Sequence, residues 1–224
     1  MKMTYRKAAF IGLWAGVIFA SCSSDEDMIT GKTLPQGKYP VAMTVSVESP
    51  IARSSVDGTW TNGEKVTVQA ITKTGDAYNW NDAASYPYEI NNDIPAASTK
   101  KETHYWQRSD ETKLMRAWHC ADGSTSNTLP DSWSVAADQN ETGNGYAESD
   151  LLFTAPVEVK FGSTADLIFY HQTARIIVNI KKTEGIDSAD QIQSVKIGDN
   201  NLALSGTYTA PSGTGVTTGT WLPG

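Results

Sequence analysis

Every second residue is apolar in several short segments of this chain. Residues 41–48 have the sequence VAMTVSVE, with apolar side chains at most odd-numbered positions, and residues 65–72 have the sequence KVTVQAIT. Successive side chains of a β-strand point to opposite faces, so this alternation is typical of a strand with one buried face. No segment carries a sustained apolar stripe at helical spacing. The sequence therefore predicts an all-β fold, specifically an antiparallel β-sandwich.

Further strands are predicted along the chain, with the clearest alternation in its second half. The Asn62-Gly63 pair predicts a turn before residues 65–72, because both residue types tolerate a positive φ. The other predicted strands are residues 86–90, 103–108, 114–120, 157–161, 165–172, 174–181, 195–197 and 202–204. The apolar positions of the strongest strands define the expected core. That core contains Val66, Val68, Val157, Val159, Phe161, Leu167, Phe169, Ile176, Val178 and Ile180.

The N-terminus has the parts of a secretory signal peptide. Three cations precede an apolar run at residues 8–20, which is too short to cross roughly 30 Å of hydrocarbon as a helix. The run ends at Phe19-Ala20-Ser21-Cys22, which resembles the lipobox of bacterial lipoproteins, although Phe19 stands where leucine is usual. The resemblance implies a signal peptide at residues 1–21, cleavage between Ser21 and Cys22, and lipidation of Cys22. The alternative is an ordinary signal peptide followed by an incidental cysteine.

The segment after the signal peptide is polar. Residues 22–40 show no periodicity, which predicts a flexible stalk. The acidic run at residues 23–27 resembles the export signal that sends lipoproteins of Bacteroides-type bacteria to the outer face of the outer membrane. A solvated acidic linker is the alternative. Since two acyl chains anchor a protein stably, we expect a surface-exposed lipoprotein of the cell outer membrane.

Composition and motifs argue against nucleic-acid binding, catalysis and metal binding. The chain has 18 Lys and Arg against 25 Asp and Glu, a net charge of −7, whereas a nucleic-acid binder needs a basic surface. The sequence contains no GxSxG, GxxxxGK[ST], HExxH or dinucleotide-binding glycine motif. Cys120 follows His119, but no CxxC or HxxxH spacing accompanies it, so a buried apolar cysteine is expected there. We therefore expect no enzyme, no catalytic residues, no bound metal and no cofactor.

Two segments of the body resemble a known family. Residues 52–66 contain Arg53 followed by TWTNGEKV, which resembles the "R…W-x-x-G-D-K-I" segment of fimbrillin-like proteins. Residues 167–180, LIFYHQTARIIVNI, resemble their "F-x-H-x-x-A-K-V-x-V-x-I" strand pair. Together with the lipobox, these segments resemble the N-terminal region of fimbrillin-like lipoproteins, which form or decorate type V pili.

The resemblance implies a fold and an assembly mechanism. The fold would be a transthyretin-like antiparallel β-sandwich of Greek-key type at residues 41–210, and the Gly- and Thr-rich residues 211–224 would be an open end where the family's second domain begins. A protease would cut between Arg53 and Ser54, and the strand at residues 41–48 would leave. The C-terminal strand of another pilus subunit would then fill the groove by β-strand addition. Adhesion to host or bacterial surface ligands would follow, with the protein held on the outer membrane or incorporated in fimbriae.

Each residue implied by the resemblance also has a simpler explanation. Arg53 can be an ordinary solvated arginine, and Ser188, within an Asp-Ser-Ala match to a short O-glycosylation motif, can be a chance match. His171 is expected on the buried face of its strand, bonded to a neighbouring strand. Trp60 is expected to be a packing anchor rather than a sugar platform.

Two other functions remain open from the sequence. A surface glycan-binding lipoprotein would use exposed, coplanar aromatic side chains and the long loop at residues 121–150. Its platform would be built from Trp80, Trp106, Trp118 and Trp133. A surface hydrolase would need two carboxylates brought together in a cleft.

Overall fold

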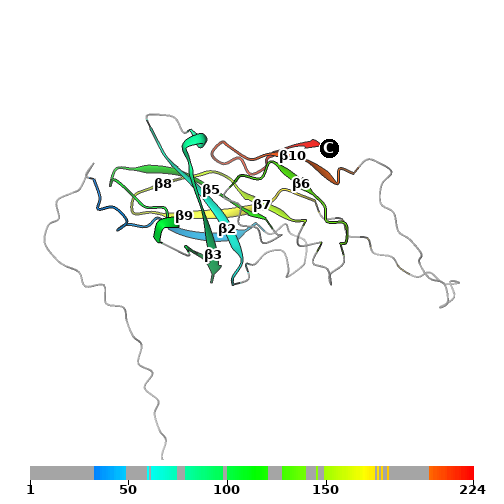
Figure 1. Cartoon of the computed structure of the whole chain (residues 1–224), viewed down its shortest axis with the longest axis horizontal. Helices are drawn as coiled ribbons and strands as arrows, with labels where there is room; N and C mark the ends of the chain where they lie inside the picture. Colours follow the sequence, from blue (N-terminus) through cyan, green and yellow to red (C-terminus); the bar gives the residue numbers. More distant parts are fainter. Residues whose placement is uncertain are drawn as a thin grey trace, which may run out of the picture.

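The computed structural model describes the greater part of the chain after its N-terminal region (Figure 1). The described residues are 33–48, 60, 62–74, 79–97, 100–120, 128–139, 145, 149–174, 176, 178, 181 and 202–224. The strands are β1 (Ala42–Val47), β2 (Lys65–Thr72), β3 (Ala84–Asn91), β4 (Ile94–Ala97), β5 (Thr112–Cys120), β6 (Ser132–Ser134), β7 (Leu151–Thr154), β8 (Val157–Lys160), β9 (Thr164–His171), β10 (Ser205–Thr209) and β11 (Thr220–Pro223). Two short 3-10 turns are η1 (Trp80–Asp82) and η2 (Lys100–Glu102). The predicted all-β fold class is confirmed.

The main sheet has eight strands and nearly closes on itself. Its order is β1-β9-β7-β5-β2-β3-β4, and β8 pairs with β5 beside β7. The two ends meet where the Val45 N–H donates to the Asp93 carbonyl in the β3–β4 turn, at 3.0 Å. All neighbours run antiparallel except β1, which runs parallel to β9. The sheet is therefore mixed rather than wholly antiparallel as predicted.

A second, smaller sheet covers one face of the main sheet. Its order is β11-β10-β6, and Figure 1 shows β10 and the C-terminus lying across the longer strands. The side chains between the two layers form a separate core cluster of Trp118, Leu151, Phe153, Tyr208 and Ala210. The larger cluster lies inside the curved main sheet and includes Val45, Val68, Met115, Leu167 and Phe169. Strand β5 alternates between the two clusters, because successive side chains point to opposite faces.

Several sequence predictions are confirmed in detail. Strand β2 has the predicted bounds, and all its residues from 66 to 71 are buried since both of its faces are covered. The predicted turn lies at Asn62-Gly63, with Gly63 at a φ of +96°. Five expected core residues are buried: Val66, Val68, Val159, Leu167 and Phe169. Val157 and Phe161 are half-buried and pack against the same cluster.

The strand predicted at residues 174–181 is not found at those of its residues that the structure describes. Its described residues, including Ile176 and Val178, lie outside any strand, and these two side chains are 53% and 48% exposed. The reason is that β9 already has β1 on one edge and β7 on the other, so no edge is free to pair with a following hairpin strand. Ile180 and residues 195–197 lie outside the described residues.

Two shorter predictions also need correction. Residues 103–108 do not form a regular strand; they make isolated bridges from Tyr105 to Pro40 and from Arg108 to Thr33. Residues 202–204 are not a strand, and β10 begins at the next residue. Leu202 and Leu204 are 44% and 63% exposed, because they precede the small sheet rather than pack in it.

Candidate functional site

The residues predicted to carry modification or cleavage lie outside the described part of the chain. These residues are Ser21, Cys22, Arg53, Ser54 and Ser188. The strand that the predicted cut would release, β1, is described in full. The candidate site is therefore the groove that β1 fills.

Strand β1 and the residue just before it, Val41, place alternate apolar side chains in the main core. Val41, Met43 and Val45 are buried, while the residues between them are exposed. On the neighbouring strand β9, the residues paired with Met43 and Val45 are Ala165 and Leu167, which are also buried. Because both strands turn the same alternate positions inward, β1 forms part of the wall of the core rather than a surface addition.

The backbone of β1 is paired unequally on its two edges. On one edge its six residues form a parallel ladder with β9, which the Glu48 N–H extends by donating to the Phe169 carbonyl at 2.8 Å. On the other edge the Val45 N–H donates to the Asp93 carbonyl. Among the described strands, β9 is the one that pairs with β1. Strand β1 thus lies where the two ends of the nearly closed sheet meet, and we call this junction the seam.

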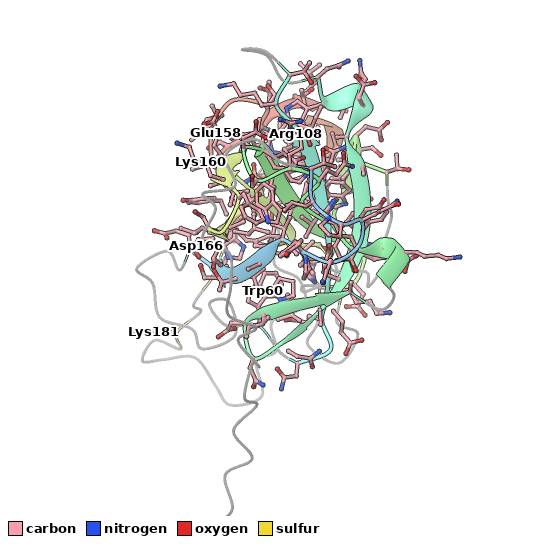
Figure 2. All side chains as sticks on the ribbon, turned by 90° about the vertical axis from the view of Figure 1, so that its left-hand side faces the viewer. Trp60, Arg108, Glu158, Lys160, Asp166 and Lys181 are labelled. Carbon is pink, nitrogen blue, oxygen red and sulfur yellow. The ribbon has the colours of Figure 1, made fainter. Side chains whose placement is uncertain are left out.

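Polar and aromatic side chains border this seam. The Thr44 hydroxyl donates to the carboxylate of Asp166 on β9, and Figure 2 shows Asp166 and Trp60 close to the ribbon of β1. The Trp60 ring meets the Phe169 ring edge-on, with 4.9 Å between ring centroids. Trp60 is half-buried and packs against the main cluster, which is the packing role expected for it.

The residues before β1 are held by a different part of the protein. We call residues 33–40 the N-terminal arm. The arm runs antiparallel to residues 104–108, where the Leu34 N–H donates to the Gln107 carbonyl at 2.8 Å and the Trp106 N–H donates to the Tyr39 carbonyl at 2.9 Å. Leu34 is 8% exposed. The end of the segment predicted to be a stalk is therefore docked on the domain.

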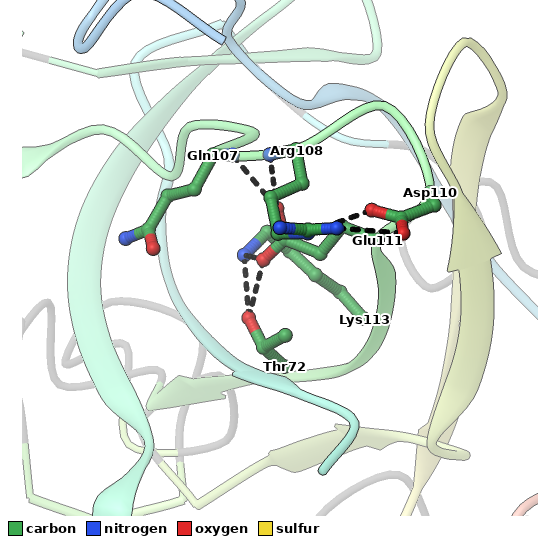
Figure 3. Close-up of polar contacts among 6 residues, drawn as sticks. All are labelled: Thr72, Gln107, Arg108, Asp110, Glu111 and Lys113. Atoms are coloured by element: carbon green, nitrogen blue, oxygen red, sulfur yellow. Dashed lines mark hydrogen bonds and ion pairs between the residues drawn. The ribbon is translucent and has the colours of Figure 1, made fainter. Parts of the chain in front are cut away.

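A buried ionic cluster fixes the backbone that receives the arm (Figure 3). The Glu111 carboxylate accepts from the N–H groups of Gln107 and Arg108, at 2.7 and 3.3 Å. It also pairs with the Lys113 ammonium at 2.6 Å and accepts from the Thr72 hydroxyl. Burial raises the pKa of the Glu111 carboxyl, but the hydrogen bonds from Lys113, Thr72 and Gln107 outweigh it and leave the pKa below its ordinary value. The carboxylate therefore stays charged and holds residues 107–108 in place.

His104 occupies the other end of the receiving backbone. It is buried, its Nε2 lies 3.0 Å from the Val68 carbonyl, and its backbone N–H donates to the Tyr88 hydroxyl. Burial lowers the pKa of His104 to about 4, so the ring is neutral near pH 7 and Nε2–H donates to Val68.

An open cleft of about 1200 Å³ lies beside the arm. Its walls include Gln36 and Gly37 of the arm, together with Tyr86, His104 and Lys113. In the part of the chain that is described, no three His, Cys, Asp or Glu side chains gather where they could hold a metal ion. Likewise, no helix within the described residues has the length and apolar character needed to cross a membrane.

The comparison with known proteins identifies the family. Residues 52–221 match the family model described as "Fimbrillin-like", which is well over half of the chain. The chain belongs to the fimbrillin-like family. This family is structural and generally non-enzymatic.

One solved structure provides a further comparison with this fimbrillin-like chain. It is the crystal structure of a fimbrial protein from Bacteroides ovatus ATCC 8483, with 15% sequence identity and a TM-score of 0.36. The aligned part covers 59% of this chain and 28% of the fimbrial protein, less than a third of the latter's length. No curated protein matches the chain.

The tryptophans of the fimbrillin-like chain do not form the platform that glycan binding would need. Trp106 and Trp118 are buried, and Trp80 and Trp133 are half-buried. The Arg116 guanidinium covers the Trp80 ring at 4.0 Å, and Trp133 meets the ring of Trp221 at 5.5 Å and 66°. Two of the four rings are buried and the other two pack against neighbouring side chains while staying partly exposed, so these four tryptophans do not form an exposed, coplanar platform.

Two further residues from the sequence analysis are His171 and Cys120. His171 is half-buried rather than fully buried, and its Nδ1 lies 3.0 Å from the carboxylate of Asp150, just before β7. This contact is the structural role expected for it, a bond next to a neighbouring strand. Cys120 ends β5, and its side chain is outside the described residues.

Gln172 is a structural residue of this fimbrillin-like chain that the sequence analysis does not single out. Its Oε1 accepts from the Tyr208 hydroxyl and from the Gly219 N–H, both at 2.9 Å. Its Nε2 donates to the Thr217 carbonyl at 3.0 Å, and its own carbonyl accepts from the Trp221 indole at 2.9 Å. One buried amide thus joins the C-terminal strands to β9. In the sequence, the one sign of this role is that Gln172 is a polar residue at the end of a predicted strand with strong alternation.

Proposed function

We propose that this protein is a structural or accessory subunit of a type V pilus that accepts a strand from another subunit in place of β1. In this proposal a protease cuts between Arg53 and Ser54, β1 leaves, and the C-terminal strand of a neighbouring subunit fills the groove. The observation that carries the proposal is the position of β1. It has β9 as its strand partner among the described strands, yet it buries Met43 and Val45 in the main core, as does the preceding Val41.

The physical argument is that loss of β1 would destabilise the protein, and that the groove it leaves would favour incoming strands with apolar residues at alternate positions. Without β1, the paired edge of β9 exposes unpaired backbone groups, and the core loses three apolar side chains. Burying each such side chain contributes roughly 1.5–3 kcal/mol. A strand with apolar residues at alternate positions recovers both contributions, whereas a strand without that alternation recovers the backbone bonds alone.

The proposal extends to the location and organisation of the chain. We place the protein on the outer membrane as a surface-exposed lipoprotein anchored through Cys22, with adhesion as its role and Ser188 as a glycosylation site. The signal peptide is residues 1–21, and the domain at residues 41–210 is the transthyretin-like, Greek-key β-sandwich of the family. Residues 211–224 contain β11 of the small sheet and, in this proposal, lead on toward a second domain. Support comes from the lipobox-like segment at residues 19–22 and from the family match.

The experiment is limited proteolysis of the folded protein with an arginine-specific protease, followed by a binding assay. The peptide after Arg53 should be cut before those after Arg108 and Arg116, because Arg108 is held by Asp110 at 2.8 Å and Arg116 is buried. A synthetic C-terminal strand of a neighbouring subunit should then bind the cut protein and not the uncut protein. Arg53→Ala is the matched control and should neither be cut there nor bind the strand. If cutting creates no new binding, surface display without strand exchange is the better account.

A further inference from the structure

The N-terminal arm and β1 are consecutive in the chain but are held by different elements. The arm pairs antiparallel with residues 104–108, and β1 pairs parallel with β9. The change of partner occurs at Val41, whose N–H donates to the His104 carbonyl at 2.9 Å. Because the two ladders share no backbone partner, the pairing of β1 can be lost while the pairing of the arm is kept.

We infer that the N-terminal arm is a latch, which keeps the N-terminal segment on the protein after the cut behind β1 and sets the rate at which another strand replaces it. This inference rests on the proposed function, since it concerns the regulation of the same groove. It adds a component that lies outside both the groove and the cleavage site.

The arm has the contacts that a latch needs. The Leu34 side chain is buried in the main cluster, and its N–H donates to the Gln107 carbonyl. At the other end, the Tyr39 carbonyl accepts from the Trp106 N–H, and the Tyr39 ring meets the Phe161 ring edge-on at 5.9 Å. The arm is therefore fastened at both of its ends.

The surface that receives the arm is rigid. The Glu111 carboxylate holds the N–H groups of Gln107 and Arg108, which leaves the Gln107 carbonyl fixed toward Leu34. Trp106 is buried and meets Phe161 edge-on at 5.9 Å. Since this backbone is fixed by contacts that do not involve the arm, it can release the arm and bind it again without rearranging.

The arm is also weak enough to be released. Leu34 is buried, whereas residues 35–40 are exposed. Gln36 and Gly37 border the open cleft of about 1200 Å³ rather than a packed core. In contrast, β1 buries Met43 and Val45 and pairs along its whole length with β9. Because the arm buries less of its surface than β1 does, we expect it to slow the release of the N-terminal segment without preventing that release.

Hydrogen exchange on the uncut, full chain is the first test. Leu34→Ala should raise the exchange rates of the backbone amides of residues 34 and 106 at least about tenfold, because it removes the one buried side chain of the arm. The Val45 and Glu48 amides, which report on β1, should keep their protection. Lys38→Ala, an exposed position of the same arm, is the control and should change neither pair. Equal loss of protection at both pairs of amides would show that arm and β1 open as one unit, and would overturn the latch.

The second test measures rates on the protein cut after Arg53. A labelled synthetic peptide with the sequence of residues 41–48 is the probe, because that sequence already fits the groove. Leu34→Ala should take up the probe at least about tenfold faster than the wild type, and Lys38→Ala should match the wild type. Uptake at the same rate in all three proteins would overturn the latch while leaving strand exchange standing.

The experiments distinguish a failure of strand exchange from a failure of the latch. If no protein takes up the probe, strand exchange fails, and the latch is then judged by the spontaneous loss of the cut N-terminal segment on dilution, followed by native mass spectrometry. Faster loss from Leu34→Ala than from the wild type supports the latch. Equal loss contradicts it.

Discussion

The backbone N–H of Val45 donates to the carbonyl of Asp93 at 3.0 Å, and this bond joins the first strand of the main sheet to the turn before its last strand. Asn92 and Asp93 both have positive φ in that turn, at 52° and 60°, as a tight hairpin turn requires. The Asn92 N–H is held by the Asn62 side chain at 2.8 Å. The turn that closes the sheet against β1 is thus positioned by a second turn from another part of the chain.

Charge at the seam should destabilise the fold, whereas charge after β9 should not. Val45→Asp places an unpaired carboxylate in the main cluster, and we expect it to lower the free energy of unfolding by about 3 kcal/mol or more. Val178→Asp introduces the same group at a side chain that is 48% exposed, so its effect should stay within about 0.5 kcal/mol. Urea unfolding followed by tryptophan fluorescence measures both. A large loss in Val178→Asp would mean that residues 174–181 form the buried strand that the sequence predicts.

Stability should depend on pH through His104. Burial lowers its pKa from 6.5 to about 4, so between these values the unfolded chain binds a proton that the folded chain does not. Stability is therefore complete above pH 6.5 and falls as the pH drops toward 4, by on the order of 3 kcal/mol from this group. Lys113 adds to the effect, while the Val68 carbonyl opposes it.

The measurement for His104 is the free energy of unfolding at several pH values between 4 and 6.5. His104→Gln removes the titrating ring, so its stability should show a smaller slope over this range, whatever its absolute value. An unchanged slope in His104→Gln would show that the ring is protonated in the folded protein and would contradict the buried, neutral geometry.

The buried amide of Gln172 should hold the C-terminal strands in place. Gln172→Ala leaves the Tyr208 hydroxyl and the Gly219 N–H without their acceptor, and we expect a loss of about 2–4 kcal/mol. Proteolysis within residues 205–224 should also become faster. Gln107→Ala is the control, because the Gln107 side chain is exposed and points away from the ionic cluster in Figure 3. Equal protease resistance in the two variants would argue that the small sheet is held by its apolar contacts alone.

The strands that the sequence predicts well are two in which apolar and polar residues alternate. Residues 65–72 and 165–172 were predicted within one residue of the observed bounds, because their alternation reflects packing in the sheet. The same alternation failed at Ile176 and Val178. Periodicity shows which face of a strand is apolar, but it carries no information on whether a neighbouring strand has a free edge.

The candidate site was harder to predict than the fold, because its contacts join distant parts of the chain. The parallel pairing of β1 with β9 connects residues about 120 positions apart, and no local pattern encodes the direction of such a pair. The arm has one buried residue, Leu34, and no periodicity, so it was grouped with the stalk. The cluster around Glu111 depends on the 104–108 backbone coming near β5, which residue types alone do not reveal.

Lipid attachment tests the location independently of the groove. Metabolic labelling with a fatty acid should tag the wild type and leave Cys22→Ala unlabelled, since Cys22 ends the lipobox-like segment. Cys120→Ala is the matched control and should label as the wild type does. Equal labelling of the wild type and Cys22→Ala would contradict anchoring through this cysteine.

The central claim is that another strand replaces β1, and native mass spectrometry of the cut protein tests it most directly. The protein cut after Arg53 is mixed with a labelled peptide of residues 41–48, and the masses of the folded complexes are followed over time. The account predicts that each bound peptide accompanies the loss of one N-terminal segment. A peptide with aspartate at the positions of Val41, Met43 and Val45 should not exchange, because these side chains are buried. Peptide still bound beside the N-terminal segment at the end of the time course, or no peptide bound at all, would contradict replacement of β1.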